Sequence, residues 1–133
     1  MKEKFLKYLG LVDIDVLDYS ILVSIGKSKK QIEAFLIKQK APKQCIKDIL
    51  SEANSNSSGI FLYNYTNLGF LEMKNFDGSW KWLDTPNHEV AHFVDFISKD
   101  FSFADETEFK AYLHESTNKK IRRILFKACN RMK

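Results

Sequence analysis

Apolar residues in the first part of the chain are spaced first as in a strand and then as in a helix. The run YSILVSI at 19–25 is apolar and partly β-branched, which predicts a buried strand. Ser28 and Gln31 then have the spacing of a capping box, which predicts a helix over about 29–39. The residues that this helix would bury are Ile32, Phe35 and Leu36. A second helix should follow Pro42, with an inner face made of Cys45, Ile46, Ile49 and Leu50.

The middle third predicts a small, mainly antiparallel sheet. Its expected strands are IFLYNY (60–65), GFLEMKNF (69–76) and SWKWL (79–83). Asp77-Gly78 is a two-residue hairpin signal between the last two. Residues 2–9 suggest a short helix, and NSNSSG at 54–59 suggests a flexible connection. The three aspartates of DIDVLD at 13–18 could bind a cation, but a solvated loop is the favoured interpretation. The sequence contains no internal repeat.

Helical spacing returns after residue 85. Thr85 and Pro86 have the pattern of an N-cap followed by proline at the first helical position, and the helix should run to about Lys99. The apolar stripe of this helix consists of Val90, Val94 and Ile97, widened by Phe93 and Phe96, and a polar stripe consists of His88, His92, Asp95 and Lys99. Asp105 resembles the N-cap of another helix from 106 onward, and residues 101–104 are enough for it to fold back antiparallel.

Composition fits one domain with one modest core. Hydrophobic residues make up 44% of the 133 residues, so we expect a single domain over 1–133. Residues 1–53 would supply a strand and helices, and residues 60–133 the sheet and the remaining helices. No segment approaches the ~18–20 apolar residues of a membrane span, and charged residues interrupt any signal-peptide core. The expectation is a cytoplasmic protein without a membrane partner.

The two cysteines and the excess of positive charge suggest little specific chemistry. Cys45 and Cys129 belong to no CxxC pair and are interpreted as reduced, packed thiols, with a disulfide between them as the alternative. The net charge is +4, and seven basic residues lie in NKKIRRILFKACNRMK at 118–133. This segment is interpreted as an amphipathic helix docked on the core. A nucleic-acid or acidic-partner surface is the alternative, although a single aromatic residue, Phe126, lies among the basic ones, too few for a stacking platform.

The pentapeptide HEVAH at 88–92 carries the clearest candidate chemistry. His88 and His92 lie four residues apart, so a helix stacks their rings on one side, where both can face one zinc ion. Glu89 then lies beside such an ion and can accept a proton from a zinc-bound water. The alternative is a pair of solvated histidines on a polar helix face. The position of the motif in a helical segment, off its apolar stripe, favours a Zn²⁺ site.

A catalytic zinc needs a third protein ligand. Asp95 is seven residues from His88, ~10 Å along a helix axis, so it is either an outer partner of the His92 ring or an exposed carboxylate. Glu108, on the next helix, is the expected ligand, with Glu106 as the fallback. Glu108 instead has capping-box-like spacing to Asp105, which is the competing interpretation. His114 lies well off the Glu108 face and is expected to be a surface histidine.

Residues 60–125 resemble the small zincin-like metallopeptidases encoded by phages and prophages. The residues that carry the likeness are His88, Glu89, His92, Asp95 and Phe96, then Asp105, Glu106, Glu108, Ala111, Tyr112 and Leu113, preceded by LGF at 68–70. The resemblance implies an α+β, zincin-like fold, in which a mainly antiparallel sheet packs against the HExxH helix and an antiparallel Glu-bearing helix. It also implies a gluzincin-like site with Glu108 as third ligand. One departure is His114-Glu115-Ser116, where a Gly-Tyr pair is expected.

The sequence therefore predicts a zinc-dependent peptidase. His88, His92 and Glu108 would hold Zn²⁺, Glu89 would be the general base, and Tyr112 would help to stabilise the oxyanion. A peptide or protein substrate would add as a strand to an edge formed by IFLYNY or SWKWL. The strongest alternative is a catalytically silent zincin scaffold that binds a phage or host protein or belongs to a virion, and nucleic-acid binding comes third.

Overall fold

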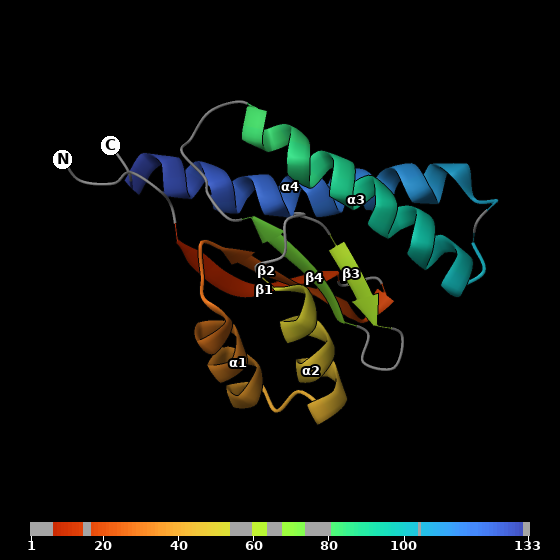
Figure 1. Ribbon diagram of the computed structural model, residues 1–133. Helices are drawn as coiled ribbons and strands as arrows, with labels where there is room; N and C mark the ends of the chain where they lie inside the picture. The colour runs from red at the N-terminus through yellow and green to blue at the C-terminus, as the bar shows by residue number, and fades with distance from the viewer. Residues whose placement is uncertain are drawn as a thin grey trace.

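The computed structural model describes residues 7–14, 17–53, 60–63, 68–73, 81–103 and 105–131. Four strands and four helices occur in these ranges (Figure 1). In chain order they are β1 (Tyr8–Ile14), β2 (Tyr19–Ile25), α1 (Lys29–Lys38), α2 (Lys43–Glu52), β3 (Ile60–Tyr63), β4 (Leu68–Met73), α3 (Lys81–Asp100) and α4 (Thr107–Arg131). The α+β class predicted from the sequence is confirmed.

The strands form one mixed sheet in the order β1-β2-β4-β3. The two outer pairings, β1 with β2 and β3 with β4, are antiparallel, and only the second of them lies in the antiparallel sheet that the sequence predicted. The central pairing of β2 with β4 is parallel, and Leu22 lies opposite Phe70 in its register. Helices α1 and α2 cover one face of the sheet, and α3 and α4 cover the other (Figure 1).

The two halves of the chain repeat the same topology. Each half contains an antiparallel strand pair followed by two helices, and the second strands of the two pairs, β2 and β4, lie side by side in the sheet. Because β2 and β4 are parallel while the two helix pairs lie on opposite faces, the halves are related by an approximate two-fold axis along the strands. This repeat exists in topology and has no counterpart in the sequence.

Alternation along β2 divides the hydrophobic interior into two cores. Ile21, Val23 and Ile25 face α3 and α4, whereas Leu22 faces α1 and α2. Nearly every residue of β2 is therefore buried, as expected for a central strand covered on both faces. The core below α3 and α4 also contains Val90, Phe93, Val94, Ile97, Leu113, Ile121 and Leu125.

The first helix begins as the sequence predicts. The Ser28 side chain accepts from the Gln31 backbone N–H at 3.2 Å, and the Gln31 side chain accepts from the Ser28 N–H at 3.0 Å, so the capping box is complete. Ile32 and Leu36 are buried and Phe35 is half-buried. In α2, Cys45 is buried, as predicted, while the side chain of Cys129 lies outside the description.

Three predictions of secondary structure are wrong in the described residues. Tyr8 and Leu9 belong to β1 instead of a helix over 2–9, because pairing with β2 continues from Ile14 back to Tyr8. Asp13, assigned to a loop, is also in this strand. Lys81–Leu83, the described part of the predicted strand at 79–83, belong to α3 and are helical. Ser79, Trp80, Asp77-Gly78 and NSNSSG lie outside the described residues.

Helix α3 therefore begins before Pro86, which was expected at its first position. Proline lacks the N–H that would bond to the Trp82 carbonyl four residues earlier, so one hydrogen bond is missing inside the helix. The ring of Pro86 is buried, and its packing offsets part of that loss.

Helix α4 is continuous from the Glu108 region into the basic segment. Ile121 and Leu125 are buried, and the Lys120 ammonium group donates to the Asp13 backbone carbonyl on β1. The described part of the basic segment is thus docked on the core, which is the interpretation that the sequence favoured. None of the helices in the described ranges has the length and apolarity that crossing a membrane requires.

Candidate metal centre

Helix α3 presents the HExxH motif to solvent because its opposite side is held by the sheet. Val90, Phe93 and Ile97 are at most 1% exposed and share one core with residues of β2 and β4. Successive residues of an α-helix are rotated by 100°, so positions away from this apolar stripe face outward. His88 and His92 are two of these positions, and both are exposed. The apolar stripe read from the sequence therefore fixes the direction in which the histidines point.

The two imidazoles converge at their Nε2 atoms. These atoms lie 3.1 Å apart, with ring centroids separated by 4.6 Å and ring planes at 87°. Two nitrogens bound to one tetrahedral zinc at ~2.0–2.1 Å would be roughly 3.3 Å apart. The pair thus has a spacing suited to shared coordination of one ion, and one ring nitrogen can equally donate to the other when no ion is bound.

Glu89 lies one position round the helix from His88 and is half-buried. An exposed carboxylate is surrounded by water, whereas a half-buried one has fewer competing solvent molecules and a more restricted range of side-chain positions. The position next to the histidines, and not in line with them, is the one that the HExxH motif assigns to a proton acceptor.

Asn87, immediately before His88, is held by two residues of α4. The His114 ring nitrogen Nε2 lies 3.3 Å from the Asn87 backbone carbonyl, and the Asn118 side-chain amide donates to Asn87 Oδ1 at 3.0 Å. His114 is half-buried at the surface, as predicted, and in addition contacts α3. The sequence signal for this clamp was Asn118, a polar residue within the buried stripe of α4, which is 8% exposed.

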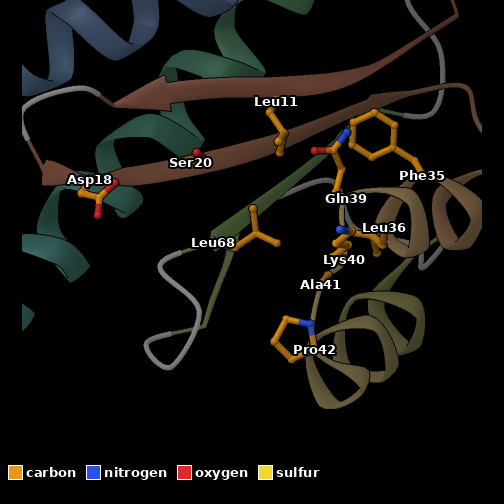
Figure 2. Close-up of a pocket in the computed structure, with 10 residues that line it drawn as sticks. All are labelled: Leu11, Asp18, Ser20, Phe35, Leu36, Gln39, Lys40, Ala41, Pro42 and Leu68. Atoms are coloured by element: carbon orange, nitrogen blue, oxygen red, sulfur yellow. The ribbon is translucent and has the colours of Figure 1, made fainter.

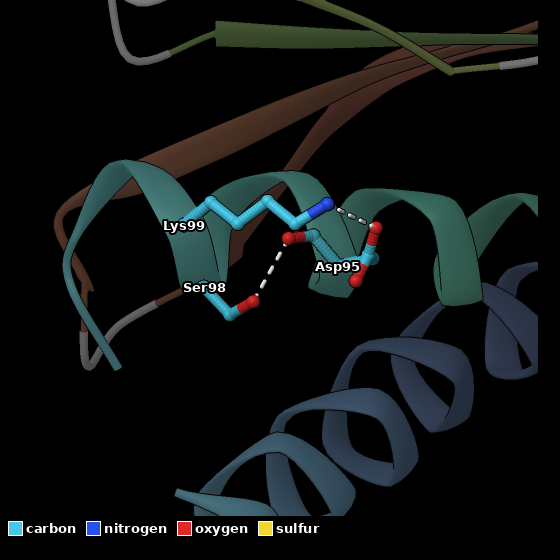
Figure 3. Close-up of polar contacts among 3 residues, drawn as sticks. All are labelled: Asp95, Ser98 and Lys99. Carbon is cyan, nitrogen blue, oxygen red and sulfur yellow. Dashed lines mark hydrogen bonds and ion pairs between the residues drawn. The ribbon is translucent and has the colours of Figure 1, made fainter. Parts of the chain in front are cut away.

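Asp95 does not serve as a partner for His92. Its Oδ2 atom pairs with the Lys99 ammonium group at 3.3 Å, and its backbone carbonyl accepts from the Ser98 hydroxyl at 2.8 Å (Figure 3). Both charged side chains are well exposed, so the ion pair contributes little, typically less than about 1 kcal/mol. The structure agrees with the exposed-carboxylate interpretation of Asp95.

The structure does not group a third ligand with the histidines. Glu108 is exposed in the first turn of α4, which begins at Thr107, two residues after the expected N-cap Asp105. Glu106 is also exposed. Across the described ranges, no three His, Cys, Asp or Glu side chains lie close enough together to hold a metal ion.

Tyr112, the expected oxyanion partner, is 55% exposed. Its ring stacks against Phe109 with centroids 6.5 Å apart, and Phe109 in turn contacts Phe103 at 4.8 Å. These contacts hold the ring of Tyr112 at the start of α4. A role in catalysis stays a prediction.

A hollow lies on the other face of the sheet, away from the histidines. It has a volume of about 370 Å³ and is lined by β1, β2, β4, the end of α1 and the turn before α2 (Figure 2). Leu11, Phe35 and Leu68 provide apolar walls, and Asp18 and Lys40 provide charge near its rim. None of the residues predicted for the metal site lines this hollow.

No protein-family model, curated protein or solved structure matches the chain. Functional inference therefore depends on the residues of the chain and on the geometry that the fold gives them.

Proposed function

We propose that the chain is a zinc-dependent peptidase of the HExxH type. The observation that carries the proposal is the 3.1 Å separation of the His88 and His92 Nε2 atoms on the exposed side of α3. The resemblance of residues 60–125 to zincin-like metallopeptidases adds the reaction class. The two histidines supply two of the three expected protein ligands. The remaining protein ligand comes from α4, where Glu108 is the candidate from the sequence.

In this proposal Glu89 transfers the protons. Bound zinc supplies positive charge and lowers the pKa of a coordinated water to ~7. With zinc held there, Glu89 would accept a proton from the attacking water and would later deliver it to the departing amine nitrogen. The carboxylate ends the cycle deprotonated, as it began. Tyr112 is the candidate donor to the carbonyl oxygen.

The edge of the sheet next to α3 offers a place for an extended substrate. Strand β3 is at this edge, contacts α3, and within the described residues pairs with β4 alone. A peptide that added to β3 would satisfy the outward backbone groups of this strand and pass beside the HExxH helix. The proposed substrate class is accordingly an extended segment of a peptide or protein.

A Glu89→Gln variant tests the proposal because it removes the proton acceptor and keeps the size of the side chain. We expect the wild-type chain to bind about one zinc and to cleave a pool of unstructured peptides, with zinc lost in His92→Ala. Glu89→Gln should retain zinc and lose cleavage. Glu33→Gln, an exposed carboxylate on α1, is the matched control and should cleave normally.

A catalytically silent scaffold is the second candidate. The feature that favours it is the exposure of a histidine pair with no third ligand grouped beside it in the described residues. A wild-type protein that binds zinc but leaves varied peptides intact would support a role in protein–protein interaction. A protein that binds no zinc would contradict the peptidase proposal.

A further inference from the structure

The Asn87 clamp fixes how α3 and α4 align. The helices are antiparallel, with Phe103 and Phe109 in contact near the turn and Asn87 in contact with His114 and Asn118 further along. Asn87 therefore lies level with the part of α4 between His114 and Asn118. Each step forward along α3 corresponds to a step backward along α4, so His88 is level with Glu115, and His92 is level with Ala111.

The same contacts show which side of α4 Glu115 occupies. Leu113, Thr117 and Ile121 are buried toward the sheet, and His114 and Asn118 face α3. Successive residues turn by 100°, so Glu115 lies one step beyond His114, on the outward side of the seam between the helices. On α3, Asn87 faces α4, and the next residue, His88, therefore lies on the outward side of the seam in the same way. Glu115 and His88 therefore border the same seam from opposite sides.

Small residues border the seam at this point. Ala91 on α3 and Ala111 on α4 are both exposed and lie next to the histidines in the alignment. Methyl groups leave room between the helices that longer side chains would fill. Glu115 is itself exposed, so its carboxylate can turn toward the histidines without breaking any packing.

Glu108 occupies a less favourable position. It precedes Glu115 by seven residues, which places it ~10 Å nearer the start of α4. In the alignment it is level with Asp95, whose carboxylate is paired with Lys99. Neither Glu108 nor Asp95 is level with the histidine pair.

We propose that Glu115 is the third zinc ligand and turns toward His88 and His92 when zinc binds. The inference rests on the proposed zinc site and replaces Glu108 in it. Glu115 is two residues, ~3 Å, from the level midway between the histidines, against ~7.5 Å for Glu108. The clamp residues on either side of Glu115 hold the helix alignment on which the assignment depends.

Competition of the purified, metal-stripped chain with a chromophoric chelator for Zn²⁺ tests the assignment. Glu115→Gln should weaken zinc binding by at least the ~10–100-fold that loss of an outer partner costs. Glu108→Gln should weaken it far less, and Glu33→Gln should leave it unchanged. The absorption of bound Co²⁺ should change in Glu115→Gln and stay as in the wild type in Glu33→Gln, which reports on the ligand set without any assay of cleavage.

Other outcomes separate this inference from the proposed function. Loss of affinity in Glu108→Gln with none in Glu115→Gln would assign the ligand to Glu108 and overturn the inference, while the zinc site would stand. Wild-type affinity in both variants would likewise overturn it. Unchanged zinc affinity in His92→Ala would remove the site itself, and with it both proposals. Circular dichroism of each variant would verify that the helices are intact.

Discussion

Asn87 and Asn118, which are 31 positions apart, join the HExxH helix to the last helix by a 3.0 Å side-chain hydrogen bond. Asn118 is 8% exposed, and its Oδ1 atom has no hydrogen-bond partner among the described residues. A buried amide of this kind has few alternative partners when one is lost. The pair is therefore expected to matter for both helix alignment and stability.

Asn87→Ala should lower the free energy of unfolding by about 1–3 kcal/mol, because it leaves the Asn118 amide buried without its acceptor. Urea unfolding followed by circular dichroism measures the change. Gln44→Ala is the control, since Gln44 bonds Asp48 at 2.9 Å on the exposed surface of α2 and should change stability by less than about 0.5 kcal/mol. Equal small losses in both variants would contradict a structural role for the clamp.

Thr117→Val should stabilise the protein. Thr117 is 1% exposed, and its hydroxyl oxygen has no hydrogen-bond partner within the described part of the chain. Replacing it by a methyl group of similar size removes the cost of burying an unsatisfied hydroxyl, about 1–3 kcal/mol in mutational data. Thermal and urea unfolding measure the gain. The exposed Thr107→Val is the control, and destabilisation by Thr117→Val would mean that the hydroxyl has a partner.

Two phenylalanines on α3 should respond differently to truncation. Phe93 is fully buried and its ring lies 5.5 Å from that of Tyr19, so Phe93→Ala should cost about 3–5 kcal/mol. Phe96, three residues later, is 40% exposed and should cost much less on truncation. The comparison holds the residue type and the helix constant. Similar losses from both variants would show that the orientation of α3, and hence of its histidines, is different.

Ser28→Ala tests the start of α1. Loss of the side-chain acceptor for the Gln31 N–H should cost about 1 kcal/mol. Ser51→Ala provides the comparison, because the Ser51 hydroxyl only donates to the Asp48 carbonyl within α2. Ser51→Ala should change the free energy of unfolding by no more than about 0.5 kcal/mol. The midpoint of urea unfolding distinguishes the two, and a Ser28→Ala midpoint equal to the wild type would count against the cap.

Local signals predicted the elements that they specify by themselves. The capping residues Ser28 and Gln31 fix the start of α1 through hydrogen bonds between near neighbours, and the apolar run at 19–25 matches β2. The convergence of His88 and His92 is also local, since four residues make about one turn of any α-helix. Where a pattern depends on contacts within one element, the sequence was sufficient.

Sequence patterns gave wrong predictions where contacts with a distant segment of the chain decide the secondary structure. Residues 8–14 form a strand because β2 lies beside them, and residues 81–83 join α3 despite a strand-like spacing of aromatic residues. The parallel pairing of β2 with β4 joins segments separated by α1, α2 and β3. Nothing local in either strand specifies this neighbour.

The sequence by itself determined that one helix carries two adjacent imidazoles with a glutamate beside them, because helical periodicity is a property of neighbouring residues. Only the tertiary structure decided which residues of α4 lie opposite that motif. The alignment depends on the packing of two helices on a shared sheet and on bonds from Asn87 to His114 and Asn118, which no spacing along the chain encodes.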